Sequence, residues 1–209
     1  FQPDMLVLTG DLTDGFWPEG YAQIASMLTA QPYPSLLLPG NADNRGLMRQ
    51  QWGNERWAQN ASGEALHFSQ NASGLRLLGL DTSVSEQSYG DVTGHLEWLD
   101  KQLDAAGEAP VLLFLHNHGF PTGRHTLDET MCRGPSEFRE VVRRTPARLL
   151  ARAAGHGHRP VVGTFDGLPA SSWGSGCAAN PHRAGAENDT VIGRATARER
   201  VEVLGGAGS

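Results

Sequence analysis

The sequence predicts an α/β protein with a mixed sheet. Short apolar runs, of the length of buried strands, alternate with segments in which apolar residues recur every three or four positions, as they do in helices. Two pairs of apolar runs are separated only by turn-forming residues, which is typical of antiparallel hairpins. Because helical crossovers join parallel strands and hairpins join antiparallel ones, we expect both kinds of pairing.

Each element follows from its local pattern. The first half should contain, in order, a strand at about 5–9, a helix marked by Tyr21, Ile24, Met27 and Leu28, a strand at about 35–39, a helix from about Asn44 to Trp52, and a hairpin of strands Leu66–Ser69 and Leu75–Leu80. The turn of that hairpin is expected within Asn71-Ala72-Ser73-Gly74.

The second half continues the alternation. It should contain a helix from about His95 to Ala106, a strand at 111–115, a loop from His116 to about Arg133, a helix from about Pro135 to Arg144, a strand Leu149–Ala154, and a hairpin of strands at about 160–165 and 169–174. The polar end of the chain shows little pattern. We therefore predict one domain over residues 1–182 and a tail of unassigned structure over 183–209.

The composition of the chain limits the classes of partner that it can bind. The chain has 209 residues, a net charge of −6 and no basic cluster, which argues against a nucleic-acid surface. No apolar stretch approaches the length of a membrane span. The chain opens on Phe1-Gln2-Pro3-Asp4 without a visible signal peptide, and its two cysteines, Cys132 and Cys177, fit free thiols in a reducing compartment. We expect a cytoplasmic protein with no nucleic-acid or membrane partner.

Four predicted strands end at side chains that can bind a metal. These side chains are Asp11, Asn41, His116, and the pair His156 and His158. Ligands of α/β sheets collect beyond the carboxyl ends of the strands, where all five residues are expected. A carboxylate, an amide oxygen and imidazoles form a mixed shell that suits a dinuclear hydrolytic centre, which would hold a phosphate group. Each residue alone has a structural explanation, such as a turn or a core histidine; their combination predicts a metal site.

The segments around these residues resemble the calcineurin-like metallophosphoesterases, and within them the class III cyclic-nucleotide and glycerophosphodiester phosphodiesterases. The resemblance is carried by Gly10-Asp11-Leu12-Thr13-Asp14, Leu38-Pro39-Gly40-Asn41-Ala42-Asp43-Asn44-Arg45, Leu113–His116 with Phe120–Gly123, Gly155–Pro160, and Gly94–Leu99. It covers roughly residues 3–182. It implies a four-layer α-β-β-α sandwich with mixed sheets.

The resemblance also implies two divalent ions (Mn, Fe, Zn or Co). One would be held by Asp11, Asn41, His116 and His156. The other would be held by Asp11, His158 and an upstream Asp-x-His motif. No such motif precedes Gly10 in this sequence, so we expect the family's N-terminal strand to be missing from this chain.

Two further positions carry expected catalytic roles, and one departs from the family. Asp43 would orient a neighbouring group. His182 matches a substrate-side histidine of the family, although it also fits a solvated surface residue. Ala42 stands where the family has a histidine credited with aiding the leaving group, and losing such a general acid typically costs about 10²–10⁴-fold in rate. After His116 the family usually has a second histidine; here Asn117 follows, and His118 is a weaker candidate ligand.

The function that the resemblance implies is metal-dependent hydrolysis of a small phosphodiester, of the cyclic-nucleotide or glycerophosphodiester type. The alternatives are a catalytically inactive homologue that binds metal or phosphate, and a fragment of a longer enzyme. Whether the chain forms a homodimer stays open.

Overall fold

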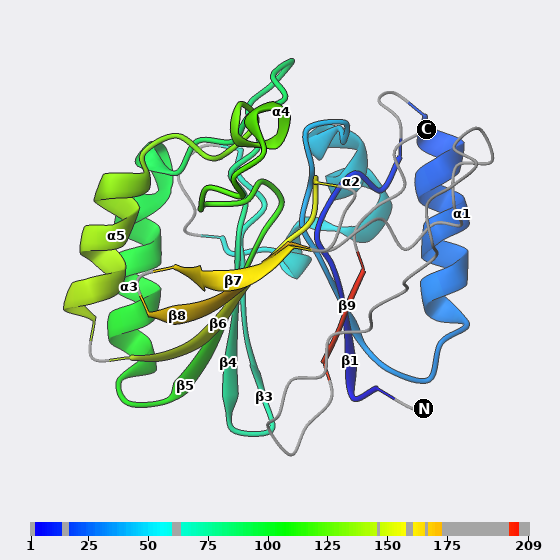
Figure 1. The fold of residues 1–209 in the computed structure, drawn as a ribbon. Coiled ribbons are helices and arrows are strands. Elements are labelled where there is room, and N and C mark those ends of the chain that lie inside the picture. Colours follow the sequence, from blue (N-terminus) through cyan, green and yellow to red (C-terminus); the bar gives the residue numbers. More distant parts are fainter. Residues whose placement is uncertain are drawn as a thin grey trace.

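Two β-sheets face each other between two pairs of helices (Figure 1). The computed structural model describes residues 3–13, 17–59, 64–145, 147–157, 161–165, 167–172 and 201–204. Helices α3 and α5 cover the outer face of the larger sheet, and α1 and α2 lie on the outer side of the smaller one (Figure 1). The predicted four-layer α-β-β-α sandwich is confirmed.

The smaller sheet has three parallel strands in the order β2-β1-β9. Its strands and covering helices are β1 (Met5–Leu8), α1 (Pro18–Thr29), β2 (Ser35–Leu37), α2 (Arg45–Trp52) with the 3₁₀ helix η1 (Asn54–Arg56), and β9 (Val201–Leu204). Parallel pairing brings the ends of β1 and β2 to one edge, where the two glycine-containing loops follow. β9 comes from the segment 183–209, and the domain boundary at residue 182 stays a prediction.

The larger sheet has six strands in the order β3-β4-β5-β6-β8-β7. Their bounds are β3 (Phe68–Ala72), β4 (Leu75–Leu80), β5 (Pro110–Leu115), β6 (Arg148–Ala154), β7 (Val161–Phe165) and β8 (Leu168–Ser172). Strands β4, β5, β6 and β8 pair in parallel, whereas the edge pairs β3–β4 and β7–β8 are antiparallel. The predicted mixture of pairings is therefore confirmed.

The first predicted hairpin is present, but the bounds of its first strand differ from the prediction. β3 reaches Ala72 instead of ending at Ser69, and Ala72 pairs with Leu75. The turn consists of Ser73 and Gly74 alone, both at positive φ (46° and 86°). A two-residue turn of this conformation matches the twist of the flanking strands, so pairing continues up to it.

One α-helix, α4 (His125–Asp128), was not predicted. The 116–133 segment, expected to be a loop, contains this single-turn helix. Its support is local, because the Asp128 carboxylate accepts hydrogen bonds from the Thr122 and Gly123 amides. The other helices of this half are the 3₁₀ helix η2 (Thr93–His95), α3 (Leu96–Ala106) and α5 (Pro135–Arg144).

Three apolar clusters fill the three spaces between the layers, and alternation along the strands assigns residues to them. On β5, Val111 and Leu113 pack toward α3 and α5, whereas Leu112 and Phe114 point into the space between the sheets. The third cluster, which includes Tyr21 and residues of α2, lies between the smaller sheet and its helices. This packing holds the strand ends of both sheets in fixed positions.

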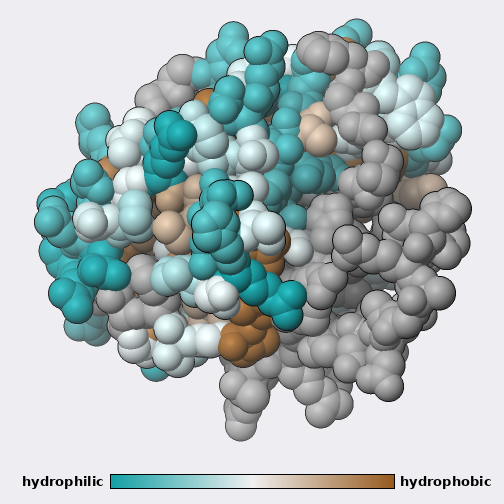
Figure 2. Space-filling model, turned by 45° about the horizontal axis from the view of Figure 1, so that its top comes forward, coloured by the Kyte–Doolittle hydropathy of each residue, from teal (hydrophilic) through white to brown (hydrophobic). Residues whose placement is uncertain are grey.

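The described surface is largely hydrophilic on the face drawn in Figure 2, with a few hydrophobic residues among polar ones. Within the described part of the chain, no helix combines the length and apolar character that a membrane crossing requires. Cys132 is a buried free thiol, and Cys177 lies outside the described residues. The cytoplasmic location stays a prediction.

Candidate metal centre

The loops after β1 and β2 touch each other through two glycines. A Cβ on Gly10 would lie 2.4 Å from the Gly40 nitrogen, and a Cβ on Gly40 would lie 2.2 Å from Oδ1 of Asp11. Gly10 also has φ of +103°, a conformation that only glycine adopts without strain. Because no side chain separates the loops, the Asp11 carboxylate reaches the second loop, where its Oδ1 accepts a hydrogen bond of 2.9 Å from the Ala42 amide.

His116 follows β5 and is buried among these loops. Its Nδ1 lies 2.7 Å from the carbonyl oxygen of Thr9, which can only accept, so Nδ1 carries the proton. The lone pair of Nε2 is therefore directed into the site. Nε2 lies 3.1 Å from Oδ1 of Asn41, 3.1 Å from Nδ1 of His156 and 3.3 Å from Oδ2 of Asp11.

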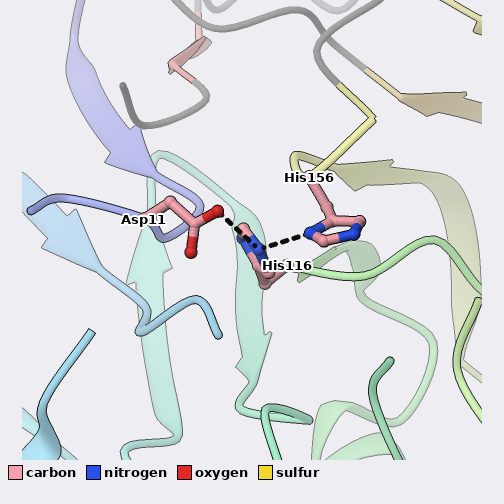
Figure 3. Close-up of side chains that lie close together, drawn as sticks. All are labelled: Asp11, His116 and His156. Carbon is pink, nitrogen blue, oxygen red and sulfur yellow. Dashed lines mark hydrogen bonds and ion pairs between the residues drawn. The ribbon is translucent and has the colours of Figure 1, made fainter. Parts of the chain in front are cut away.

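Three of these residues, Asp11, His116 and His156, converge closely enough for one cation, and Asn41 adjoins them through His116. The ligand atoms of Asp11, His116 and His156 all lie within 4.8 Å of one another, and Figure 3 shows Asp11 and His156 on either side of His116. Nitrogens bound to one Zn²⁺ at about 2.0–2.1 Å are roughly 3.0–3.5 Å apart, which matches the observed spacing. A carboxylate, an amide oxygen and two imidazoles thus fit a divalent metal ion.

The electrostatics of the pair of Asp11 and His116 favour an ionised carboxylate. Burial alone would raise the pKa of Asp11, but the hydrogen bond and charge of His116, with the Ala42 amide, lower it to about 2. Burial opposes the charged form of His116 as well, yet Asp11 raises the pKa of this histidine. The negative charge that a cation requires is therefore present at neutral pH.

Asp43 lies beside this centre and acts on the backbone. Its carboxylate accepts hydrogen bonds from the amides of Gly40 (2.8 Å), Leu12 (3.0 Å) and Thr13 (3.2 Å), and from the hydroxyl of Tyr21 (3.0 Å). Burial raises the pKa of Asp43 to about 6, against the lowering effect of these amides. Asp43 thereby ties the loop after β1 to the loop after β2.

Tyr21 belongs to this arrangement, although the sequence pattern marked it only as one of the residues at helical spacing. Its ring is buried on α1, and its hydroxyl donates to Asp43 while accepting a hydrogen bond of 2.8 Å from the amide of Asn44. The signal that could have identified it is chemical, because a buried tyrosine hydroxyl needs a hydrogen-bond partner.

The structure thus brings together Asp11, Asn41, His116 and His156, the residues expected to hold one metal ion. His158 and His182 lie outside the described residues, so their roles stay predictions. His118 is buried elsewhere, with its Nε2 3.8 Å from Oδ1 of Asp128, and is not part of the described metal-binding group.

A sandwich of two sheets that gathers carboxylate and imidazole donors at its strand ends is the arrangement of a metallohydrolase. The family model of the calcineurin-like phosphoesterases matches residues 1–160, and the chain belongs to this family. Family membership implies divalent metal ions.

Among the relatives, the glycerophosphodiester phosphodiesterase GpdQ of Enterobacter lignolyticus is 28% identical over 75% of this chain and 56% of its own length. A probable cyclic nucleotide phosphodiesterase of Rhodococcus erythropolis is 30% identical over 84% of this chain and 58% of its own length. The chain therefore spans little more than half the length of these relatives. A dimetal phosphatase from Danio rerio shares the fold, with a TM-score of 0.66 and 17% identity, over 82% of this chain and 72% of that chain.

Proposed function

We propose that this chain carries the metal centre of a phosphodiesterase that hydrolyses a small phosphodiester of the glycerophosphodiester or cyclic-nucleotide type. The observation that supports the proposal is the convergence of Asp11, Asn41, His116 and His156 at one point beyond the strand ends. Relatives named as glycerophosphodiester and cyclic-nucleotide phosphodiesterases support the substrate class.

The residues of the chain divide the work. Divalent ions, when bound, would neutralise the phosphate and lower the pKa of a water nucleophile. Asp11 supplies an anionic oxygen, Asn41 a neutral one, and His116 a lone pair whose direction is fixed by the Thr9 carbonyl. Asp43 contributes indirectly, because it holds both loops that carry the oxygen donors.

Leaving-group protonation is the step for which this chain is poorly equipped. Ala42 meets the centre through its amide, which donates to Asp11, and its methyl side chain has no proton to give. We infer that turnover is reduced by about 10²–10⁴-fold relative to a homologue with a histidine there.

The test measures metal content and hydrolysis together. After reconstitution with Mn²⁺, we expect weak, chelator-sensitive hydrolysis of bis(4-nitrophenyl) phosphate and slower hydrolysis of the corresponding monoester. Asp11→Asn should abolish the residual activity, whereas Asp100→Asn, a surface control on α3, should preserve it. Hydrolysis that survives Asp11→Asn and chelation would contradict the proposed function, and fast chelator-sensitive turnover would contradict only the inferred impairment.

Ala42→His tests the inferred impairment directly. It should raise the diester hydrolysis rate only in protein that binds two metal ions. A large gain in protein that binds one ion would show that the assigned roles are wrong.

A binding protein without turnover is the second candidate, and Ala42 is the observation that favours it. In that case the Mn²⁺-loaded chain would bind inorganic phosphate without hydrolysing either ester, and Ala42→His would leave both rates at zero.

A further inference from the structure

A cavity of about 370 Å³ lies among β2, η1, β3, β4 and α3, and includes Arg56, Arg76 and Gln102 in its wall. Arg76 pairs in register with Val111, which precedes His116 by five positions. At about 3.3 Å per residue, Arg76 therefore lies roughly 16 Å along the sheet from the metal centre. The arginines of the cavity belong to the opposite end of the strands.

Within the described residues, the hydrogen-bond partners of Arg76 are neutral. Its two terminal nitrogens donate to Oδ1 of Asn71 (2.9 Å) and Oε1 of Gln102 (3.1 Å), and its Nε is buried without a hydrogen bond. No carboxylate of the described residues lies within 4.0 Å of its guanidinium. A buried N–H donor of a charged group without an acceptor is costly, so a change of the Arg76 rotamer that turns Nε toward an oxyanion in the cavity would be favourable.

Arg56 adds a second guanidinium at the exposed rim of the same cavity. It donates to the carbonyl oxygen of Ser35 (2.8 Å), which is also neutral, and it has no carboxylate within 4.0 Å among the described residues. By contrast, Arg45 and Arg144 are each paired with an aspartate, at 2.6 and 2.7 Å. Burial lowers the pKa of Arg56, whereas the charge of Glu55, its neighbour in the chain, still acts on it and raises this pKa. The cavity wall therefore holds two guanidinium groups and one carboxylate, and neither guanidinium has a carboxylate of the described residues within 4.0 Å.

Gln102, another polar residue of the cavity wall, also offers a hydrogen-bond donor that is free among the described residues. Oε1 of Gln102 already accepts from Ser69 (2.6 Å) and Arg76, and within the described residues its amide nitrogen has no acceptor. Glu55 is the carboxylate of the wall, but it lies against Gly53, where a Cβ would be 2.3 Å from its Oε1. Trp57 supplies an apolar surface, and its Nε1 donates a hydrogen bond to the carbonyl oxygen of Leu37.

We propose that this cavity is a second binding site, which takes a small organic anion through one carboxylate or phosphate group held by Arg76 and Arg56. Guanidinium groups bind both oxyanions through paired hydrogen bonds, and the cavity is of the size that small-molecule sites have. The ligand's remaining atoms would lie against Trp57 and Gln102. This site is independent of the proposed hydrolysis.

The test uses the whole chain in metal-free form, so that the phosphodiesterase centre takes no part. Inorganic phosphate and succinate are titrated separately, and the ¹⁵N–¹H resonance of Arg76 Nε is followed by NMR beside calorimetry. We expect saturable binding of one anion per chain with a Kd of about 1 mM or tighter for at least one probe, and a shift of the Arg76 Nε resonance. Phosphate and succinate thus separate the two oxyanion classes.

Variants separate a built site from general charge attraction. Arg76→Gln should weaken binding about tenfold or more, and Arg76→Lys, which keeps the charge without the planar fork, should weaken it less. Arg148→Gln removes an exposed charge from the start of β6 and should leave the Kd unchanged. The proposal is overturned if neither probe saturates, if the Arg76 resonance does not move, or if Arg148→Gln weakens binding as much as Arg76→Gln. The wild-type NMR titration decides the matter even if Arg76→Gln does not fold.

Discussion

Two buried aspartates follow apolar strands, and their surroundings differ sharply. Asp81, after β4, accepts from Nε (2.6 Å) and a terminal nitrogen (2.9 Å) of Arg45, and from the amides of Leu66 (2.8 Å) and Ser83 (3.1 Å). Asp11, after β1, has the Ala42 amide and the His116 ring as its partners. Asp81 is saturated by donors, whereas Asp11 keeps oxygen lone pairs for a ligand.

The neighbouring histidines differ in the same way. Nδ1 of His67 accepts the amide proton of Asp81 (2.9 Å), and its ring packs on Trp98 with centroids 4.4 Å apart. Burial lowers the pKa of His67 to about 4, whereas Asp11 raises the pKa of His116. A strand that ends in a buried aspartate therefore does not define a metal site; the donors around the carboxylate decide its role.

Removing the Arg45 guanidinium, which pairs with Asp81, should give the largest change in stability. Arg45→Met leaves the Asp81 charge buried without its cation, and we expect the free energy of unfolding to fall by about 3–5 kcal/mol. Urea denaturation measures this loss, and Mn²⁺ affinity of the folded protein should stay within about twofold. Adding Asp81→Asn to Arg45→Met should restore part of the stability. A double variant no more stable than Arg45→Met would show that the pair is not coupled.

Substitution of Asp11 should have the opposite effect to substitution of Arg45, because it should weaken metal binding more than it weakens stability. Asp11→Asn keeps a carbonyl oxygen for the Ala42 amide but removes the anionic ligand, so Mn²⁺ affinity should fall by about 100-fold, or about 2.7 kcal/mol. We expect a smaller change in the unfolding free energy of the metal-free protein. Calorimetric titration with Mn²⁺ checks the affinity, with Asp100→Asn as the surface control. Unchanged Mn²⁺ affinity would show that Asp11 is not a metal ligand.

The pH dependence of stability tests the role of His67, which accepts the amide proton of Asp81. Its folded-state pKa of about 4 lies below the ordinary pKa of histidine, 6.5, so the unfolded chain binds the extra proton between these values. The contribution of His67 is therefore present above about pH 6.5 and is lost as pH falls toward 4. Relative to His67→Asn, whose Oδ1 can accept the same amide proton, the wild-type protein should lose about 2 kcal/mol more between pH 7 and 4.5. If urea denaturation showed the same loss of stability between pH 7 and 4.5 for the wild-type protein and for His67→Asn, His67 would not be a neutral, buried residue in the folded state.

Much of the fold and part of the site could be predicted because they depend on local sequence. Alternating apolar runs place the strands, and polar residues just beyond them place Asp11, Asn41, His116 and His156 at one edge. The Asn71–Gly74 turn was misjudged, because four turn-forming residues do not reveal which two adopt positive φ.

Long-range partners could not be predicted in the same way. Asp81 follows a strand as Asp11 does, and only the position of Arg45, 36 residues away, shows that it is occupied. The role of Asp43 depends on amides 30 and 31 residues earlier. Sequence therefore identified the residue types of the candidate site, and tertiary contacts show which of these side chains are already hydrogen-bonded to the backbone.

Tyr21→Phe should give the smallest effect, and it tests whether the Asp43 arrangement supports Asp11. The variant removes one donor to Asp43 and one acceptor for the Asn44 amide, so unfolding should become about 1 kcal/mol easier. If Asp43 positions the loops, Mn²⁺ affinity should also fall about threefold, since both oxygen donors lie on those loops. Tyr33→Phe, at a half-buried tyrosine, is the matched control for both measurements. A loss of stability with unchanged affinity would mean that Tyr21 stabilises α1 alone, and that Asp43 holds the loops without its help.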